Sequence, residues 1–180
     1  GLTVHLVEML DQVMPPLDKE MTTAINDALA RNGVELLLSD AVESFGTDGN
    51  KITATLKSGT TLTADLVVMA IGVRPESNLA SDAGLQLGDR GAIVVNQHMR
   101  TSDPDIYAVG DAVIVKHAVT GHDTMIPLAG PANRQGRIAA DHICGRDSQY
   151  RGSQGTSIVR VFDLVVGMTG LSEKMLKQSD

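Results

Sequence analysis

The segment "TSDPDIYAVGDAV", residues 101–113, decides how the rest of the sequence is interpreted. Its apolar run, Ile106 to Val109, stops at Gly110 and Asp111, which predicts a strand that ends in a glycine and a carboxylate. Glycine lets another group approach the backbone closely because it has no Cβ. The carboxyl ends of strands are where open α/β sheets bind ligands, and a carboxylate there can accept hydrogen bonds from two hydroxyls of a polyol. A surface turn is the alternative, since Gly and Asp are common turn residues.

The first part of the sequence has the order strand, helix, strand. Residues 3–8 are apolar and end in Glu8, and Asp18 is placed to cap a helix that ends at Gly33. Apolar residues recur at helical spacing within that helix, and the apolar run 34–38 follows it. This order is typical of a parallel sheet.

The period of the apolar pattern then changes from helical spacing to alternation. Alternating residues between 41 and 64, with turn signals around Gly49 and Gly59, predict a small antiparallel meander. Residues 66–71 are wholly apolar, so we expect a strand there that is buried on both faces. Residues 72–92 are rich in Gly, Asp and Pro and are expected to connect two lobes.

The second part of the sequence contains fewer regular elements. The pattern predicts strands over residues 93–99 and 106–110 and a helix from Pro131 to Cys144. An alternating strand pair is expected within residues 156–170. We find no internal repeat.

The bulk properties exclude several classes of protein. The formal net charge of −7, without a basic cluster, argues against nucleic-acid binding, and no apolar run is long enough to span a membrane. Cys144 is the only cysteine, which excludes an internal disulfide and fits a reducing cytoplasm; near a helix end, its role is expected to be structural. The five histidines lack metal-ligand spacing. We therefore expect a cytoplasmic protein that acts on a small molecule, without nucleic acid, membrane or metal.

Three further features allow either a functional or a plain structural interpretation. Gly72 follows an apolar run, which fits a turn or a chain passing between two nucleotides. Leu128 and Ala129 precede Pro131, which suits a first helical position, so free N–H groups there can stabilise an anion or an electron-rich carbonyl. Glu8 lies at a strand end, where an acid meets ribose hydroxyls in dinucleotide sites.

Together these features resemble the flavoproteins with two dinucleotide-binding domains, the pyridine nucleotide-disulfide oxidoreductases. Their second flavin motif is Thr, four residues, an apolar residue, Tyr-Ala, any residue and Gly-Asp. It is filled here by Thr101, Ile106, Tyr107, Ala108, Gly110 and Asp111. Residues 66–75 look like the linking motif of the same superfamily, and residues 126–147 and 155–171 are similar to the branch of coenzyme A-disulfide reductases, NADH oxidases and NADH peroxidases.

The resemblance implies an α/β fold, a partial Rossmann-like, three-layer ββα flavoprotein with an antiparallel meander. Residues 1–72 would form the C-terminal half of the NAD(P)H-binding domain and residues 73–154 the C-terminal part of the FAD-binding domain. Residues 155–180 would begin the dimerisation domain of a homodimer. The family's glycine fingerprints and redox cysteine are not among these residues. We therefore expect an internal piece of a longer enzyme, which by itself is inactive and does not hold its cofactors.

The resemblance also assigns roles to single residues. Asp111 would hold the ribityl chain of FAD, and Gly110 would pass near its pyrophosphate. The backbone of Leu128 and Ala129 would face the pyrimidine edge of the flavin. For the second cofactor, NADH or NADPH, Glu8 would meet the adenosine ribose and Gly72 would lie near the nicotinamide. No residue of this chain is expected to be catalytic.

The implied activity is that of an FAD-dependent NAD(P)H oxidoreductase. Its acceptor would be a disulfide, a persulfide, peroxide or oxygen, reduced through the flavin and a cysteine outside these residues. Two alternatives stay open. One is a flavoprotein that resembles ferredoxin reductase or a nitrite reductase subunit, and the other is a non-catalytic assembly module.

Overall fold

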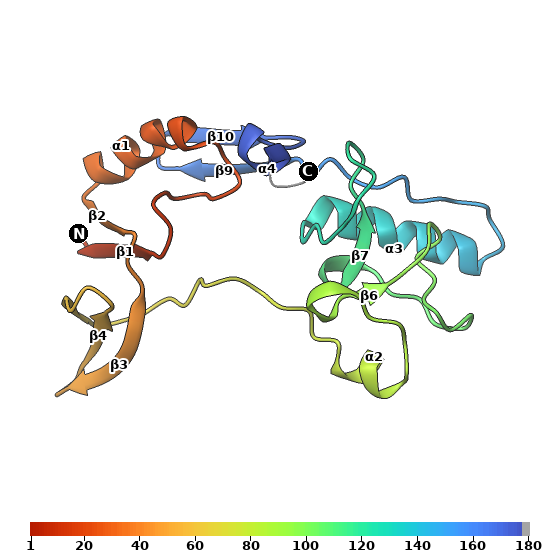
Figure 1. Cartoon of the computed structure of the whole chain (residues 1–180), viewed down its shortest axis with the longest axis horizontal. Coiled ribbons are helices and arrows are strands. Elements are labelled where there is room, and N and C mark those ends of the chain that lie inside the picture. Colours follow the sequence, from red (N-terminus) through yellow and green to blue (C-terminus); the bar gives the residue numbers. More distant parts are fainter. Residues whose placement is uncertain (178–180) are drawn as a thin grey trace. The chain divides into compact units, whose positions relative to one another are not determined.

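A computed structural model describes residues 1–177 of the chain. The chain divides into two compact units, residues 1–71 together with those from 158 onward, and residues 72–157 (Figure 1). Each unit has a core of its own and is described separately below. No helix of residues 1–177 has both the length and the apolar composition needed to cross a membrane.

The first unit begins with the expected strand–helix–strand order. Strands β1, Val4–Glu8, and β2, Val34–Leu38, pair in parallel, with Val4 opposite Val34 and Glu8 opposite Leu38. Between them the chain forms a short 3-10 helix, Lys19–Thr22, and helix α1, Thr23–Arg31. Gly33 turns the chain into β2 with a φ of 77°, a conformation that glycine adopts without strain.

Asp18 does not cap the helix that follows it, so that expectation was wrong. Its side chain makes no capping hydrogen bond to the 3-10 helix. The carboxylate instead accepts hydrogen bonds from the backbone N–H groups of Glu173 (3.2 Å) and Lys174 (2.9 Å), at the start of helix α4, Glu173–Lys177. Sequence patterns report local partners, and the partner of Asp18 lies at the other end of the chain.

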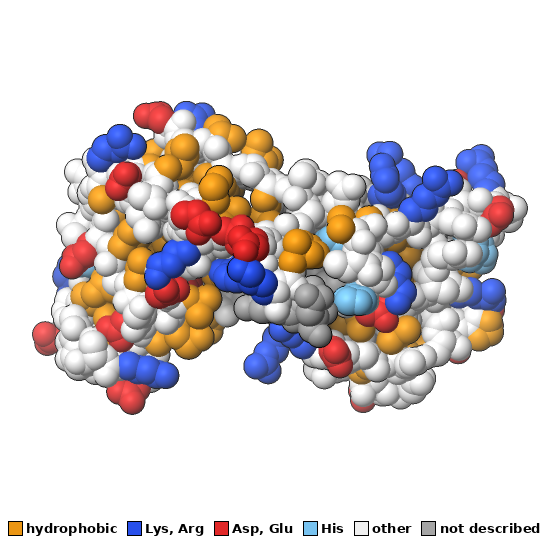
Figure 2. Space-filling view, turned by 45° about the horizontal axis from the view of Figure 1, so that its top comes forward, with side chains coloured by type: hydrophobic (Ala, Val, Ile, Leu, Met, Phe, Trp, Pro, Cys, Tyr) orange, Lys and Arg blue, Asp and Glu red, His pale blue; other side chains and the backbone are white. Residues whose placement is uncertain are grey.

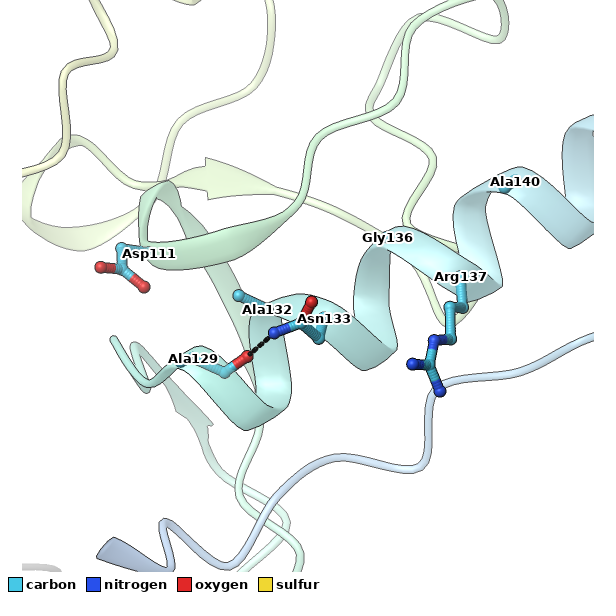
Figure 3. A pocket seen from close by; sticks show the side chains of 7 residues that line it. All are labelled: Asp111, Ala129, Ala132, Asn133, Gly136, Arg137 and Ala140. Carbon is cyan, nitrogen blue, oxygen red and sulfur yellow. Dashed lines mark hydrogen bonds between the residues drawn. The ribbon is translucent and has the colours of Figure 1, made fainter.

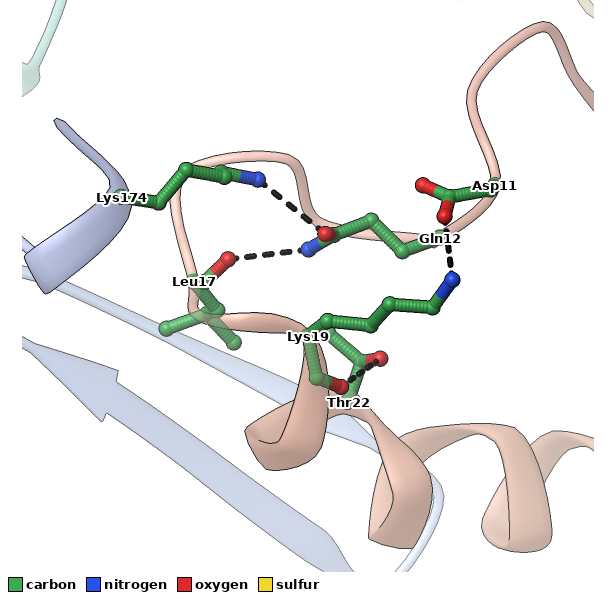
Figure 4. Close-up of polar contacts among 6 residues, drawn as sticks. All are labelled: Asp11, Gln12, Leu17, Lys19, Thr22 and Lys174. Carbon is green, nitrogen blue, oxygen red and sulfur yellow. Dashed lines mark hydrogen bonds and ion pairs between the residues drawn. The ribbon is translucent and has the colours of Figure 1, made fainter. Parts of the chain in front are cut away.

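A second contact joins the same two regions. The buried side chain of Gln12 donates through Nε2 to the carbonyl of Leu17 (2.9 Å) and accepts at Oε1 from Nζ of Lys174 (3.1 Å) (Figure 4). Lys19 and Asp11 form an ion pair beside it. These bonds fasten α4 to the loop after β1.

The expected strand pair near the C-terminal end is confirmed. Strands β9, Ser157–Val161, and β10, Leu164–Met168, form a two-stranded sheet. Val161 and Leu164 pack against the buried core of this unit, which is formed by Val13, Leu17 and Ile25. The core therefore combines side chains from both ends of the sequence.

The antiparallel meander is confirmed as strands β3, β4 and β5. They span Val42–Asp48, Lys51–Leu56 and Thr61–Ala64, and β4 pairs with both neighbours. The strand expected over residues 66–71 is absent from the described structure, where Leu66 is 72% and Ile71 87% exposed. An apolar run becomes a strand only when another strand pairs with it, and no described strand does. Hydrophobic side chains are visible on the surface of this unit in Figure 2.

The second unit contains short strands and one long helix. Strands β6, Ile93–Val94, and β7, Val113–Lys116, are parallel, and β8, Asp123–Thr124, pairs antiparallel with β7. Helix α3, Ala129–Ile143, starts two residues before Pro131. The connection over residues 72–92 contains helix α2, Asn78–Asp82, and the 3-10 helix Asp89–Gly91, which the sequence pattern did not indicate.

The prediction of a strand over residues 106–110 was wrong. Of the strand predicted over residues 93–99, only β6 forms. Residues 106–110 form only an isolated bridge, between Tyr107 and Arg100. Side chains hold this stretch in turns instead: Asn96 Oδ1 accepts from the N–H of Arg100 (3.1 Å), and Thr101 Oγ1 donates to the carbonyl of Ile106 (3.0 Å). Such bonds compete with strand pairing. Gly110 and Asp111 therefore precede a strand, β7, and do not end one.

The core of the second unit lies between β7 and α3. Its buried side chains are Met99, Val113, Val115, Ile138, Ala139 and Tyr150. Because β7 and α3 share this core, the turn before β7 is held against the first turns of the helix, where the candidate site lies.

Candidate functional site

A cavity of about 730 Å³ lies between α3 and the 3-10 turn Gly110–Ala112 that precedes β7 (Figure 3). Its lining residues are Asp111, Ala129, Ala132, Asn133, Gly136, Arg137 and Ala140. All but Asp111 come from α3. Of the residues assigned from sequence, Asp111 and Ala129 meet in this cavity.

The position of Asp111 is fixed by its neighbour Gly110. Gly110 has a φ of 87°, in the left-handed region that favours glycine. Its N–H donates a hydrogen bond of 2.7 Å to Oε1 of Gln135, a side chain only 1% exposed. Because the amide group of Gln135 is buried in α3, the turn that carries Asp111 is anchored to the helix.

The helix face that lines the cavity is made of small residues. Ala132, Gly136 and Ala140 are four residues apart, so they lie on one face of α3. A Cβ at Gly136 would have no other atom within 4 Å, which shows open space beside the helix. Figure 3 shows Asp111 across from Ala132 on this face. A long ligand can therefore lie along this small-residue stripe of the helix, with Asn133 and Arg137 beside it.

Several polar groups around the first turn of α3 are engaged in hydrogen bonds. The N–H of Leu128, the residue before the helix, donates to the carbonyl of Ile126 (2.8 Å). Asn133 Nδ2 donates to the carbonyl of Ala129 (2.9 Å). The first amides of a helix lack partners within it and favour an anion or a polarised carbonyl. Leu128 is thus the residue that precedes α3, and its own N–H is already hydrogen-bonded to Ile126.

Glu8 and Gly72 do not line this cavity. Glu8, in the first unit, accepts at Oε1 from the N–H of Leu10 (2.8 Å) and so holds the turn after β1. Gly72 has a φ of 101°, and a Cβ there would meet no atom within 4 Å. Glu8 is half-buried and Gly72 is exposed.

Sequence reasoning missed Gln135, Asn133 and Arg137. A signal for Gln135 was present in the helical pattern. It lies three and four residues before Ile138 and Ala139, which are buried, so it is a polar residue on the apolar face of α3. A polar side chain in that position requires a buried partner, and Gly110 is that partner.

The cavity fits a flavin dinucleotide chemically. The exposed carboxylate of Asp111 accepts hydrogen bonds from hydroxyls, the small-residue face of α3 admits an extended molecule, and Arg137 adds a cation. The described residues contain no group of three or more His, Cys, Asp or Glu side chains able to hold a metal ion. Cys144 is exposed at the end of α3 and does not line the cavity.

Several known proteins are similar in sequence to this chain. The family model for pyridine nucleotide-disulphide oxidoreductase matches residues 1–136. An NADH oxidase of Methanocaldococcus jannaschii is 38% identical over 96% of this chain and 38% of the relative. An NAD(P)H sulfur oxidoreductase (CoA-dependent) of Pyrococcus furiosus is 35% identical over 96% of this chain and 39% of the relative. The chain therefore spans less than half of each relative.

Solved structures share the fold. The reduced Bacillus anthracis CoADR-RHD superimposes with a TM-score of 0.95 and 52% identity, over 99% of this chain and 32% of that one. The water-forming NADH oxidase of Lactobacillus brevis, bound to NADH, superimposes with a TM-score of 0.94 and 32% identity. The match covers 99% of this chain and 40% of that one. These matches confirm the expected Rossmann-like α/β flavoprotein fold. Given that agreement and the family match over residues 1–136, the chain belongs to the pyridine nucleotide-disulphide oxidoreductases.

Proposed function

We propose that the chain is part of an FAD- and NAD(P)H-dependent oxidoreductase whose acceptor is a disulfide, a persulfide, peroxide or oxygen. The observation that carries this proposal is the Asp111 carboxylate on a turn anchored to α3, beside the small-residue face of the helix. The names of two relatives, NADH oxidase and NAD(P)H sulfur oxidoreductase (CoA-dependent), support a reduced nicotinamide as the electron donor and, for the second, a sulfur-containing acceptor.

In this proposal Asp111, Gly110 and Ala129 have binding roles. Asp111 would accept hydrogen bonds from ribityl hydroxyls, and Gly110 would let the pyrophosphate approach the backbone. Ala129, at the positive end of α3, would face the pyrimidine edge of the flavin. The chemistry that FAD supplies when bound is the transfer of two electrons from a reduced nicotinamide to the acceptor. The chain itself would bind and orient.

The first unit would serve the nicotinamide cofactor. Residues 1–72 would form part of its binding domain, with Glu8 at the adenosine ribose and Gly72 near the nicotinamide. Residues 73–154 would belong to the FAD-binding domain and residues 155–180 to a dimerisation domain. The first proposed boundary lies next to the division between the compact units at residues 71 and 72. A single cysteine supports a cytoplasmic location.

Exposed apolar residues on β9 and β10 support the proposed homodimer. Ile158 is 76% exposed and Val165 58% exposed. Large exposed aliphatic side chains on neighbouring strands are typical of interfaces. Sedimentation of the intact protein should give twice the monomer mass, and the Ile158→Lys substitution should shift it toward monomer.

The test of the proposal is flavin retention by the intact protein that contains this chain. Asp111→Ala should purify with much less FAD, because hydroxyls buried without a partner cost about 1–3 kcal/mol each. The matched control is Asp105→Ala, at an exposed aspartate on the same segment that does not line the cavity at Asp111. Equal, full flavin content in both variants would refute the assignment.

The same preparation separates the proposed enzyme from its alternatives. NADH oxidation with disulfide, persulfide, peroxide or oxygen supports the proposal. Activity with ferredoxin alone would favour the ferredoxin reductase-like alternative, and a flavin-free wild-type protein would favour an assembly module.

A further inference from the structure

The second unit has another cavity, of about 540 Å³, which shares no lining residue with the cavity at Asp111. It lies between the first turns of α3 and the segment 150–156. The residues that matter for its chemistry are Gly130, Arg134, Tyr150, Arg151 and Gly152. We call it the Arg134 cavity. Neither the proposed FAD site nor the proposed nicotinamide site uses it.

Tyr150 lines this cavity, and its hydroxyl has no hydrogen-bond partner among the described residues. The residue is 7% exposed, and its hydroxyl is buried. The ring is held firmly, because it packs with Met99 and Val113 and the backbone N–H of Tyr150 donates to the carbonyl of Gln97 (2.7 Å). A buried hydroxyl normally has a partner, so a ligand in the cavity would supply the missing acceptor.

Two arginines add positive charge. Arg134 and Arg151 line the cavity, and within residues 1–177 neither forms an ion pair or a side-chain hydrogen bond, whereas Arg146 pairs with Asp141. No lining residue is acidic. The cavity thus carries two guanidinium groups and no carboxylate, although the net charge of the chain is −7. The charge therefore favours an anionic ligand.

The backbone around the Arg134 cavity also favours an anionic ligand. Gly130 lies in the first turn of α3, the positive end of a 15-residue helix. Gly152 has a φ of 84°, and a Cβ there would come within 2.3 Å of the carbonyl oxygen of Lys116. The segment 150–156 is thus held closely against the end of β7.

We propose that the Arg134 cavity binds the phosphate group of a small organic phosphate. Guanidinium groups donate pairs of hydrogen bonds that match the oxygens of phosphate, and the hydroxyl of Tyr150 supplies a further donor. The cavity is much larger than one phosphate, so it leaves room for the organic part of the ligand. This inference is independent of the proposed FAD site, since the two cavities share no residue.

The experiment is calorimetric titration of the intact protein, saturated with FAD, with inorganic pyrophosphate as the probe. Wild type should bind one pyrophosphate per chain. Arg134→Gln combined with Arg151→Gln should raise the Kd at least about tenfold, because each guanidinium contributes charge-assisted bonds. Tyr150→Phe should raise the Kd about threefold or more, while its thermal midpoint stays unchanged, because the hydroxyl has no recorded partner to lose.

The control is Arg31→Gln, which removes the same charge from the exposed end of α1 in the other unit. Its Kd should equal that of wild type. Flavin absorbance is measured on every variant, and unchanged FAD content together with weaker pyrophosphate binding separates this cavity from the FAD site. Absence of saturable binding by wild type would overturn the proposal. So would an unchanged Kd in the double variant or in Tyr150→Phe, or an equal loss in Arg31→Gln.

Discussion

The buried Oε1 of Gln135 accepts a hydrogen bond of 2.7 Å from the backbone N–H of Gly110. This bond connects two segments of the proposed FAD site, the turn that carries Asp111 and the helix that lines the cavity. Gln135 itself does not line the cavity. It is therefore a positioning residue, and its effect on a ligand passes through Asp111.

Replacing Gln135 should lower both stability and flavin affinity. Gln135→Met keeps the shape of the side chain but leaves the N–H of Gly110 buried without an acceptor, at a cost of about 1–3 kcal/mol in the free energy of unfolding. Gln135→Glu retains an acceptor oxygen and should recover part of the loss. Urea denaturation and fluorescence titration with FAD measure the two effects on the intact protein.

The control for this pair is Gln86→Met, at an exposed glutamine whose side chain has no recorded hydrogen bond. It should behave as wild type in both assays. If Gln135→Met loses stability but keeps wild-type FAD affinity, the bond stabilises the fold without orienting Asp111.

Gly152 should tolerate no side chain, whereas Gly155 should tolerate alanine better. Both have positive φ, 84° and 67°, so alanine carries the backbone cost of about 1–3 kcal/mol at each. Only at Gly152 would the new Cβ meet an atom, the carbonyl oxygen of Lys116 at 2.3 Å, because nothing lies within 4 Å at Gly155. Gly152→Ala should therefore unfold at a clearly lower denaturant concentration than Gly155→Ala. Equal midpoints would show that the segment moves away from β7 at little cost.

Asp11 provides a pH-dependent contact. The hydrogen bond and charge of Lys19 hold the pKa of the Asp11 carboxyl below its ordinary value of 3.8 (Figure 4). A lowered pKa in the folded state means that this carboxylate contributes stability above pH 3.8, which is lost as the pH falls through the lower folded value. Lys19→Met should raise the pKa of Asp11 toward 3.8, as followed by NMR titration of the carboxyl carbon. Lys51→Met, which removes a lysine paired with Asp65, should leave it unchanged.

Elements with a local signal could be predicted from the sequence. The parallel pair of β1 and β2, the meander and α3 follow from apolar periodicity and turn residues, which depend on neighbouring positions. Elements that depend on distant partners could not. Residues 66–71 have a strand composition but no described strand pairs with them.

The site shows the same division. Asp111 and Ala129 were found because they belong to short, recognisable patterns, and both line the cavity. The partner of Asp18 lies 155 residues away, and Gln135 reaches Gly110 across 25 residues. Contacts between residues so far apart in the sequence have only an indirect signal in the sequence, such as a polar residue on an apolar helix face.

Cys144 should be dispensable for turnover in the intact protein. It is exposed, follows the last residue of α3 and lines neither cavity. Cys144→Ser should retain the activity of wild type, and the thiol of wild type should react with a bulky disulfide reagent without loss of bound flavin. Cys144→Ala is a second variant that removes the polar group altogether. A fall in kcat of about a hundredfold in both, equivalent to about 2.7 kcal/mol of activation free energy, would place the redox cysteine within this chain.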